Sequence, residues 1–384
     1  MNEQALLGAI EERLLEAERR IDLLGRCTPG NFQRELELAR ADVARAVQFE
    51  YAPLPDWSRV SELFDRAEEA LSRNFEGVVA RLLIERIGEL RCEVGLLDMR
   101  GRPELSVWAR RRYPAHAQDE EAARQLAEEW LAGAGGAESD GAGWDGADSN
   151  GVESTSSEST ETVELLEFAR THPSVSALGV SVFERDMPSL AAVSDEALLV
   201  RRGARVTRPE AERVLLHELY GHLAPRQRAR AEGPPFRLGT RGCSEEEEGR
   251  ALLLEQRAGL LLAARRVELA ARHLAVDWTW DGATLAEVRA RLQSRGVGAE
   301  VALRSGLRAL RGGSGRSPGM GRERIYLLAY LRVKQAFEQR PELERWFERG
   351  RLSLSGIAEL EAASEAASES AAAQPSSKST QTGV

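Results

Sequence analysis

The residues best suited to chemistry lie in the stretch RVLLHELYGHLAP, residues 213–225. It holds His217 and His222, two of the five histidines of the chain, and Glu218 directly follows the first. In the pattern H-E-x-x-H, two helical histidines bind zinc and the glutamate acts as general base. Here one residue more than in that pattern separates the histidines. The stretch predicts a metal centre if the extra residue can be accommodated.

Helix geometry decides whether the two histidines can share an ion. In a regular α-helix, residues i and i+4 differ by about 40° in azimuth, whereas i and i+5 differ by about 140°. A π-type turn absorbs one residue and occurs often at functional sites. Gly221, directly before His222, eases unusual backbone angles. We therefore predict a π-type widening or a local unwinding between Leu219 and His222.

A catalytic zinc site takes three ligands from the protein and leaves a position for water. The acidic cluster Glu245–Glu248 opens the next long helical segment and offers the third ligand. Its last member, Glu248, lies 26 residues after His222 (248 − 222). The helix macrodipole also favours glutamates in a first turn without any metal, and a histidine pair can be purely structural. The residues alone leave both interpretations open.

Helices are predicted to position these side chains. Thr207 and Glu210 form a capping box that starts a helix near Arg208. His217 then lies two to three turns inside that helix.

Ser244, with a glutamate three residues later, is predicted to start one long helix through residues 245–275. The best strand candidates are ALGVSVF, residues 177–183, and EALLVRRG, residues 196–203. We therefore expect a predominantly helical α+β fold with a small sheet beside the helix that carries the histidines.

Composition narrows the class of protein. A net charge of −10 and a pI near 5.4 argue against nucleic acid or an anionic membrane surface as the main partner. No apolar run approaches eighteen residues, and the N-terminus reads as an amphipathic helix without a secretory signal. The chain has three cysteines and no C-x-x-C pair, and this odd number argues against a disulfide framework. These features predict a cytoplasmic protein.

The chain divides by composition into three parts. Residues 1–47 are expected to be an N-terminal helical segment, and residues 48–360 the main domain. Residues 132–162 are rich in Gly, Ser and acidic side chains, which predicts a disordered insertion in that domain. Residues 361–384 are of low complexity and are expected to be a disordered tail.

Three motifs together resemble a known family. HELYGH, then FRLGT (236–240), then EEEEGRALLLE (245–255) are similar to the H-E-x-x-x-H, LGT and E-G-L-A motifs of a family of zinc carboxypeptidases. That family includes microtubule-associated tyrosine carboxypeptidases and bacterial proteins with a Q-E-G-L-A motif. YAPLP upstream and GMGRERIYLLAYLRV downstream extend the resemblance to about residues 48–358. The resemblance implies a metallopeptidase-like domain that hydrolyses the C-terminal peptide bond of a peptide or protein, with an aromatic residue as one candidate.

By position, the resemblance implies that His217, His222 and Glu248 bind Zn²⁺ and that Glu218 is the general base. Glu247 remains an alternative third ligand because the acidic run allows a shift of one residue. The chain departs from E-G-L-A at Arg250, where the motif has an apolar residue.

The substrate carboxylate must also be neutralised, and a bidentate arginine suits that task. Arg322 is a candidate for it, and Tyr326, one helical turn later, is a candidate to hydrogen-bond the oxyanion or the substrate. An ordinary surface arginine and a core tyrosine are the alternative interpretations.

Two other functions stay open. Cys243 could close a four-coordinate structural zinc site in a non-catalytic regulatory or binding protein. HELYGH is also similar to the H-E-x-x-G-H motif of dipeptidyl peptidase III, although this chain is much shorter and the gap between motifs is small. The residues leave the physiological substrate and the oligomeric state open.

Overall fold

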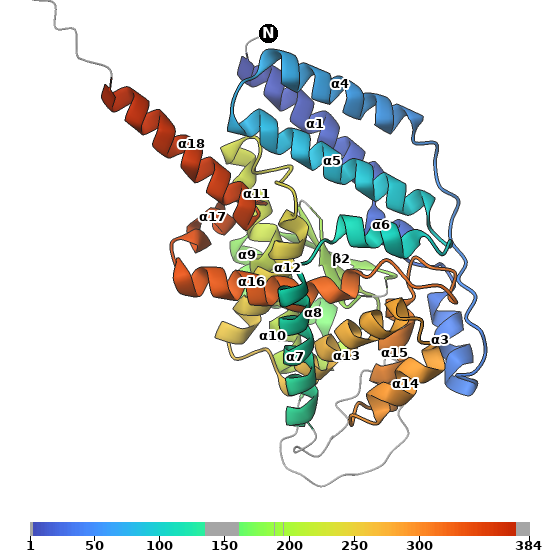
Figure 1. The fold of residues 1–384 in the computed structure, drawn as a ribbon. Helices are drawn as coiled ribbons and strands as arrows, with labels where there is room; N and C mark the ends of the chain where they lie inside the picture. Colours follow the sequence, from blue (N-terminus) through green and yellow to red (C-terminus); the bar gives the residue numbers. More distant parts are fainter. Residues whose placement is uncertain (1–2, 135–160, 188, 195, 374–384) are drawn as a thin grey trace, which may run out of the picture.

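The computed structural model describes residues 3–134, 161–187, 189–194 and 196–373 (Figure 1). Helices predominate in the described part of the chain, and short strands form two small sheets. This confirms the predicted α+β, predominantly helical fold class. Among the described residues, none of the helices is long and apolar enough to cross a bilayer.

Three N-terminal helices pack together at one end of the molecule (Figure 1). They are α1 (Glu3–Ile21), α4 (Ser58–Asn74) and α5 (Val78–Asp98). Leu14, Phe64 and Leu83, one from each helix, are buried in a single apolar cluster. The segment 1–47 therefore shares a core with the residues that follow it. The other helices of this region are α2 (Leu23–Cys27), α3 (Phe32–Ala41), α6 (Leu105–Arg112) and α7 (Ala117–Ala134).

The strands lie in the middle of the sequence, with α8 (Leu165–Thr171) and α9 (Pro173–Ala177) among them. β2 (Ser181–Arg185) pairs in parallel with β4 (Ala197–Arg201), and β3 (Ala191–Val193) pairs antiparallel with the other edge of β4. β1 (Thr162–Glu164) and β5 (Arg205–Thr207) form a separate antiparallel pair. The predicted strands at 177–183 and 196–203 thus correspond to β2 and β4, although β2 begins later than expected.

One helical run carries both histidines. It consists of α10 (Arg208–Leu215), the π-helix η1 (Leu216–Leu223) and α11 (Ala224–Glu232). As predicted, the side chain of Thr207 caps the run by accepting the N–H of Glu210 at 3.4 Å. The Glu210 carboxylate binds Arg213 in place of closing the expected capping box.

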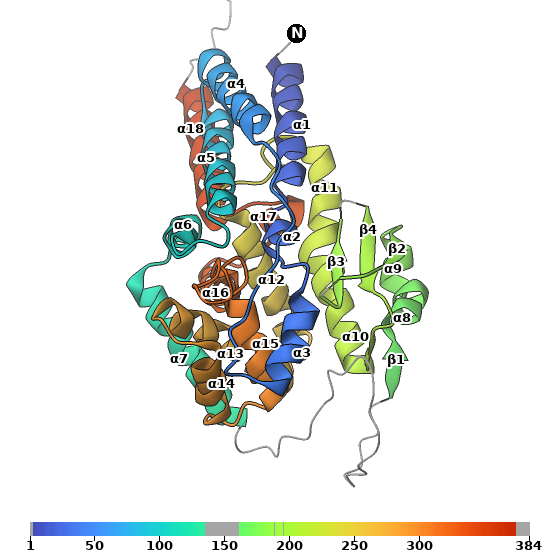
Figure 2. The ribbon, with the colours of Figure 1, turned by 90° about the vertical axis from the view of Figure 1, so that its right-hand side faces the viewer.

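α12 (Cys243–Arg257) packs against η1, and Figure 2 shows it on the opposite side of the α10–α11 run from β3 and β4. It begins one residue before Ser244, and its N-cap is Gly242. The single helix predicted over 245–275 is interrupted, because Gly259 adopts a φ of +70° and the Leu260 N–H binds the Glu255 carbonyl at 2.8 Å. This Schellman-type end separates α12 from α13 (Ala263–Trp280).

The C-terminal helices form the largest core with α7 and α12. They are α13, α14 (Leu285–Gln293), α15 (Ala299–Ala309), the 3₁₀ turn η2 (Arg322–Arg324), α16 (Ile325–Gln339), α17 (Leu343–Arg349) and α18 (Leu354–Ala373). α16 packs along α12, and η2, which directly precedes α16, therefore lies beside the first turns of α12.

The structure corrects the expected start of the C-terminal tail. Helix α18 continues to Ala373, well past residue 361. Alanine and glutamate have high helix propensity, which explains how a low-complexity sequence can be helical. The predicted insertion 132–162 falls mainly outside the described residues, but residues 132–134 belong to α7 and Thr162 begins β1.

The contact between α12 and α16 yields a stability prediction. A Cβ added to Gly249 would collide with the backbone of Ala329, so Gly249→Ala should force the two helices apart. Overpacking of this kind costs about 1–3 kcal/mol. Urea unfolding should show this loss. Gly88→Ala in α5, where a Cβ meets nothing within 4 Å, is the matched control and should be neutral or stabilising.

Candidate metal centre

The π-helix η1 aligns the two histidines. The Ala224 N–H donates to the Leu219 carbonyl five residues earlier, which is the bond that defines a π turn. The Nε2 atoms of His217 and His222 consequently face each other at 3.3 Å. The predicted widening between Leu219 and His222 is confirmed. It lets two histidines five residues apart direct their Nε2 atoms to one point, which is called the focus below.

Gly221 serves this arrangement through close packing. A Cβ on Gly221 would lie 2.6 Å from the Cβ of Ala251 in α12. Any larger side chain would therefore push η1 away from α12. The expectation that Gly221 relieves unusual backbone angles is not needed, because Gly221 is not among the residues with positive φ.

Glu248 completes a triangle with the two rings. Its Oε2 atom lies 3.3 Å from His217 Nε2 and 3.7 Å from His222 Nε2. Tetrahedral ligands at zinc–ligand distances of about 2.0–2.1 Å lie about 3.4 Å apart. Among the described residues, these three form the one group of His, Cys, Asp and Glu side chains spaced to hold a metal ion. Cys243 is not a member of that group.

The other glutamates of the acidic cluster are bound elsewhere. Glu245 pairs with Arg112, and Glu246 accepts the Leu354 N–H at 2.6 Å. Glu247 lies behind His222, with its Oε2 atom 3.8 Å from Nδ1. It also binds the guanidinium groups of Arg226 and Arg351, at 3.2 Å each. The geometry thus favours Glu248 over Glu247 as the third ligand.

Glu255 orients the first histidine, a role that the sequence analysis missed. Its Oε1 atom lies 2.7 Å from His217 Nδ1, and the carboxylate is fully buried. Burial would raise the pKa of Glu255, but Arg213 and Arg265 lower it to about 2. The ionised carboxylate accepts the Nδ1 proton of His217, so Nε2 is the ring nitrogen that would bind a metal. The available signal was spacing, since Glu255 lies two helical turns after Glu248.

The electrostatics between the rings and Glu248 favour positive charge. Burial would lower the pKa of His222, but the Glu248 carboxylate raises it to about 9. Conversely, burial would raise the pKa of Glu248, yet His222 and His217 hold it well below its usual range. Among the described residues, buried Glu248 Oε2 has no hydrogen-bond partner. A divalent cation fits this focus, because it would find a desolvated carboxylate and two imidazole nitrogens.

The remaining predicted residues surround this focus. Glu218 is half-buried, and its negative charge contributes to the raised pKa of His222 after the larger effects of burial and of Glu247 and Glu248. The Nη2 atom of Arg322 donates to Glu248 Oε1 at 3.0 Å. Burial and the nearby Glu248 charge raise the pKa of Tyr326. Arg322 is 8% exposed, so it is not the surface arginine of the alternative interpretation.

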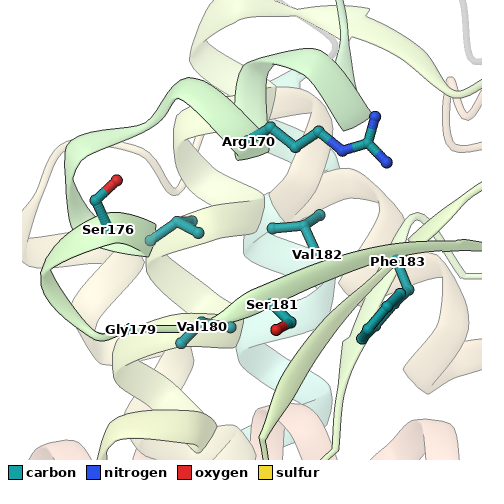
Figure 3. A pocket seen from close by; sticks show the side chains of 8 residues that line it. Arg170, Ser176, Gly179, Val180, Ser181, Val182 and Phe183 are labelled. Atoms are coloured by element: carbon teal, nitrogen blue, oxygen red, sulfur yellow. The ribbon is translucent and has the colours of Figure 1, made fainter.

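A surface hollow elsewhere contains none of these residues. It is formed by the side chains around β2 and α9, shown in Figure 3 with Arg170 on one rim and Phe183 on the other. It lies at the outer edge of the three-stranded sheet, whereas β3 at the other edge contacts η1.

Two helical histidines and a carboxylate from α12 define a candidate metal centre on a helical α+β fold. The sequence model of one family, described as microtubule-associated tyrosine carboxypeptidase, matches residues 38–376. The chain therefore belongs to this family of carboxypeptidases, which confirms the resemblance drawn from the motifs. The match favours this class over dipeptidyl peptidase III. No curated protein matches the chain.

The contact between Glu255 and His217 predicts a metal-binding defect. Glu255→Gln keeps an acceptor near Nδ1 but removes the charge that fixes the ring. Zinc affinity should fall about 10- to 100-fold, the usual cost of losing such an outer partner. Competition with a chromophoric chelator measures it. Unchanged affinity would show that Glu255 only neutralises the arginines around it.

Proposed function

We propose that the protein is a zinc-dependent carboxypeptidase that removes a C-terminal residue, with an aromatic residue as one candidate, from a peptide or protein in the cytoplasm. The observation that carries this proposal is the convergence of His217, His222 and Glu248 in a chain of the carboxypeptidase family. Two imidazole nitrogens and one carboxylate oxygen are a donor set that suits a catalytic zinc site.

Zinc bound by these residues would polarise the scissile carbonyl and lower the pKa of a bound water. Glu218 follows His217 directly on η1 and, as the half-buried carboxylate beside the ligands, is the proposed general base. It would take a proton from the attacking water and deliver it to the leaving amine. Glu248 and Glu255 are committed to other partners, so their carboxylates are unsuited to this transfer.

Arg322 and Tyr326 are proposed to receive the substrate. Arg322 holds one oxygen of Glu248 through Nη2, and its guanidinium has further N–H groups for a substrate carboxylate. Tyr326 is half-buried, and the Glu248 charge helps to raise the pKa of its hydroxyl, which is proposed to donate to the oxyanion or the substrate. Both residues lie at the junction of η2 and α16, which packs on α12.

The first functional prediction separates catalysis from metal binding. Glu218→Gln should lower kcat by about 10²- to 10⁴-fold, because it removes the proton acceptor. Zinc content should stay near one ion per chain, since Glu218 is not among the three clustered residues. Mass spectrometry of peptides with varied C-termini, with and without chelator, measures turnover, and elemental analysis measures zinc.

The matched pair Glu248→Gln and Glu247→Gln controls this experiment. Loss of zinc should accompany Glu248→Gln only, because Glu247 faces the back of His222. If Glu218→Gln itself loses zinc, Glu218 is a ligand and the proposed base is wrong.

A second functional prediction concerns the substrate carboxylate. Arg322→Lys keeps the charge but loses the planar fork that binds a carboxylate through two bonds. The preference for a free-acid peptide over its C-terminal amide, measured as a ratio of kcat/KM values, should fall about tenfold or more. A variant that loses zinc affinity but keeps this preference would assign Arg322 to holding Glu248 alone.

A further inference from the structure

The π turn leaves one backbone acceptor without a donor from its own helix. The Ala224 N–H, which would serve the Tyr220 carbonyl in an α-helix, donates to Leu219 instead. The next N–H along, which would serve Tyr220 in a π-helix, belongs to position 225, and Pro225 has none. A buried carbonyl without a partner costs free energy, so the turn needs a donor from outside.

Arg250 on α12 supplies that donor. Its Nη1 atom donates to the Tyr220 carbonyl at 2.7 Å and lies 3.3 Å from the Gly221 carbonyl. The side chain is 5% exposed, so these bonds replace water that the site excludes. Gly221 loses its regular α-helical donor for the same reason, since its i+4 residue is also Pro225.

The position of Arg250 ties two halves of the centre together. The carbonyls that it binds belong to the two residues directly before His222, and Arg250 follows Glu248 by two residues on α12. The guanidinium therefore links the turn that carries one candidate ligand to the helix that carries another. An apolar side chain, as in the E-G-L-A motif, could fill the space but could not donate.

We propose that Arg250 is a positioning residue that holds the widened turn in the register where His222 faces His217 and Glu248. It acts through the backbone of residues 220 and 221, because its hydrogen bonds within the described part of the chain go to the carbonyls of these residues and not to the three clustered side chains. The use of zinc as a probe rests on the proposed function, whereas the hydrogen-bonding role of Arg250 does not.

The test compares Arg250→Met with Arg257→Met in the full-length protein. Arg257 lies two turns later on the same helix and binds Glu344 at the surface. Zinc affinity, measured by competition with a chromophoric chelator, should fall about 10- to 100-fold in Arg250→Met and stay within twofold in Arg257→Met. The Co²⁺-substituted proteins should differ in the same way in their visible absorption spectra.

Restoring the missing donor distinguishes positioning from general destabilisation. Pro225→Ala returns an N–H to the turn, so the double variant Pro225→Ala/Arg250→Met should recover at least half of the lost zinc affinity, on a logarithmic scale. Wild-type affinity in Arg250→Met would overturn the proposal. An affinity loss that Pro225→Ala does not recover would also overturn it, because Arg250 would then act through packing alone.

Amide hydrogen exchange tests the role of Arg250 in the metal-free protein. In the metal-free protein, the Ala224 amide should exchange at least tenfold faster in Arg250→Met than in Arg257→Met, because its π-type bond to Leu219 loses support. If the wild-type protein binds no zinc, the proposed function fails, and the exchange rate of the Ala224 amide alone then tests the positioning role of Arg250. Equal exchange in the two variants would overturn the proposal.

Discussion

The candidate centre depends on how closely the π-helical segment η1 approaches α12. Gly221 permits this approach, since any Cβ there would strike Ala251. The same approach brings Glu248 within 3.3 Å of His217 Nε2 and places Arg250 against the carbonyls before His222. The packing of Gly221 against the methyl group of Ala251 therefore sets the positions of polar groups on both helices.

Buried charge around the centre is compensated pair by pair. Glu255 holds the outer nitrogen of His217 and is itself held by Arg213 at 3.0 Å. Glu248 offers one oxygen to the rings and the other to Arg322. Removing either partner would leave a buried charge uncompensated, which is costly. Such pairing fixes side-chain positions before any ligand binds. Charged and polar groups that are already fixed can stabilise the charge that develops during a reaction.

The sequence could predict the part of the site that lies on one continuous helical segment. His217 and His222 lie on one helical run, so their separation alone required a wider turn. Glu248 and Glu247 could not be distinguished by spacing, because the face that each presents depends on where α12 begins and how it packs. Glu255 was missed because its spacing of two helical turns from Glu248 is informative only once Glu248 is known to face the histidines. The predominance of helix and the small sheet followed from periodicity, whereas the break at Gly259 depends on a left-handed conformation that sequence does not specify.

Helix α12 also limits how the chain can change in length. Glu248 and Glu255 both reach His217, from opposite sides of its ring, and they do so two helical turns apart. Deleting or inserting one residue between them would rotate one carboxylate by about 100° and shift it by about 1.5 Å relative to the other. Substitutions can therefore accumulate on the outer surface of this helix, but its length between these two glutamates must be inherited unchanged.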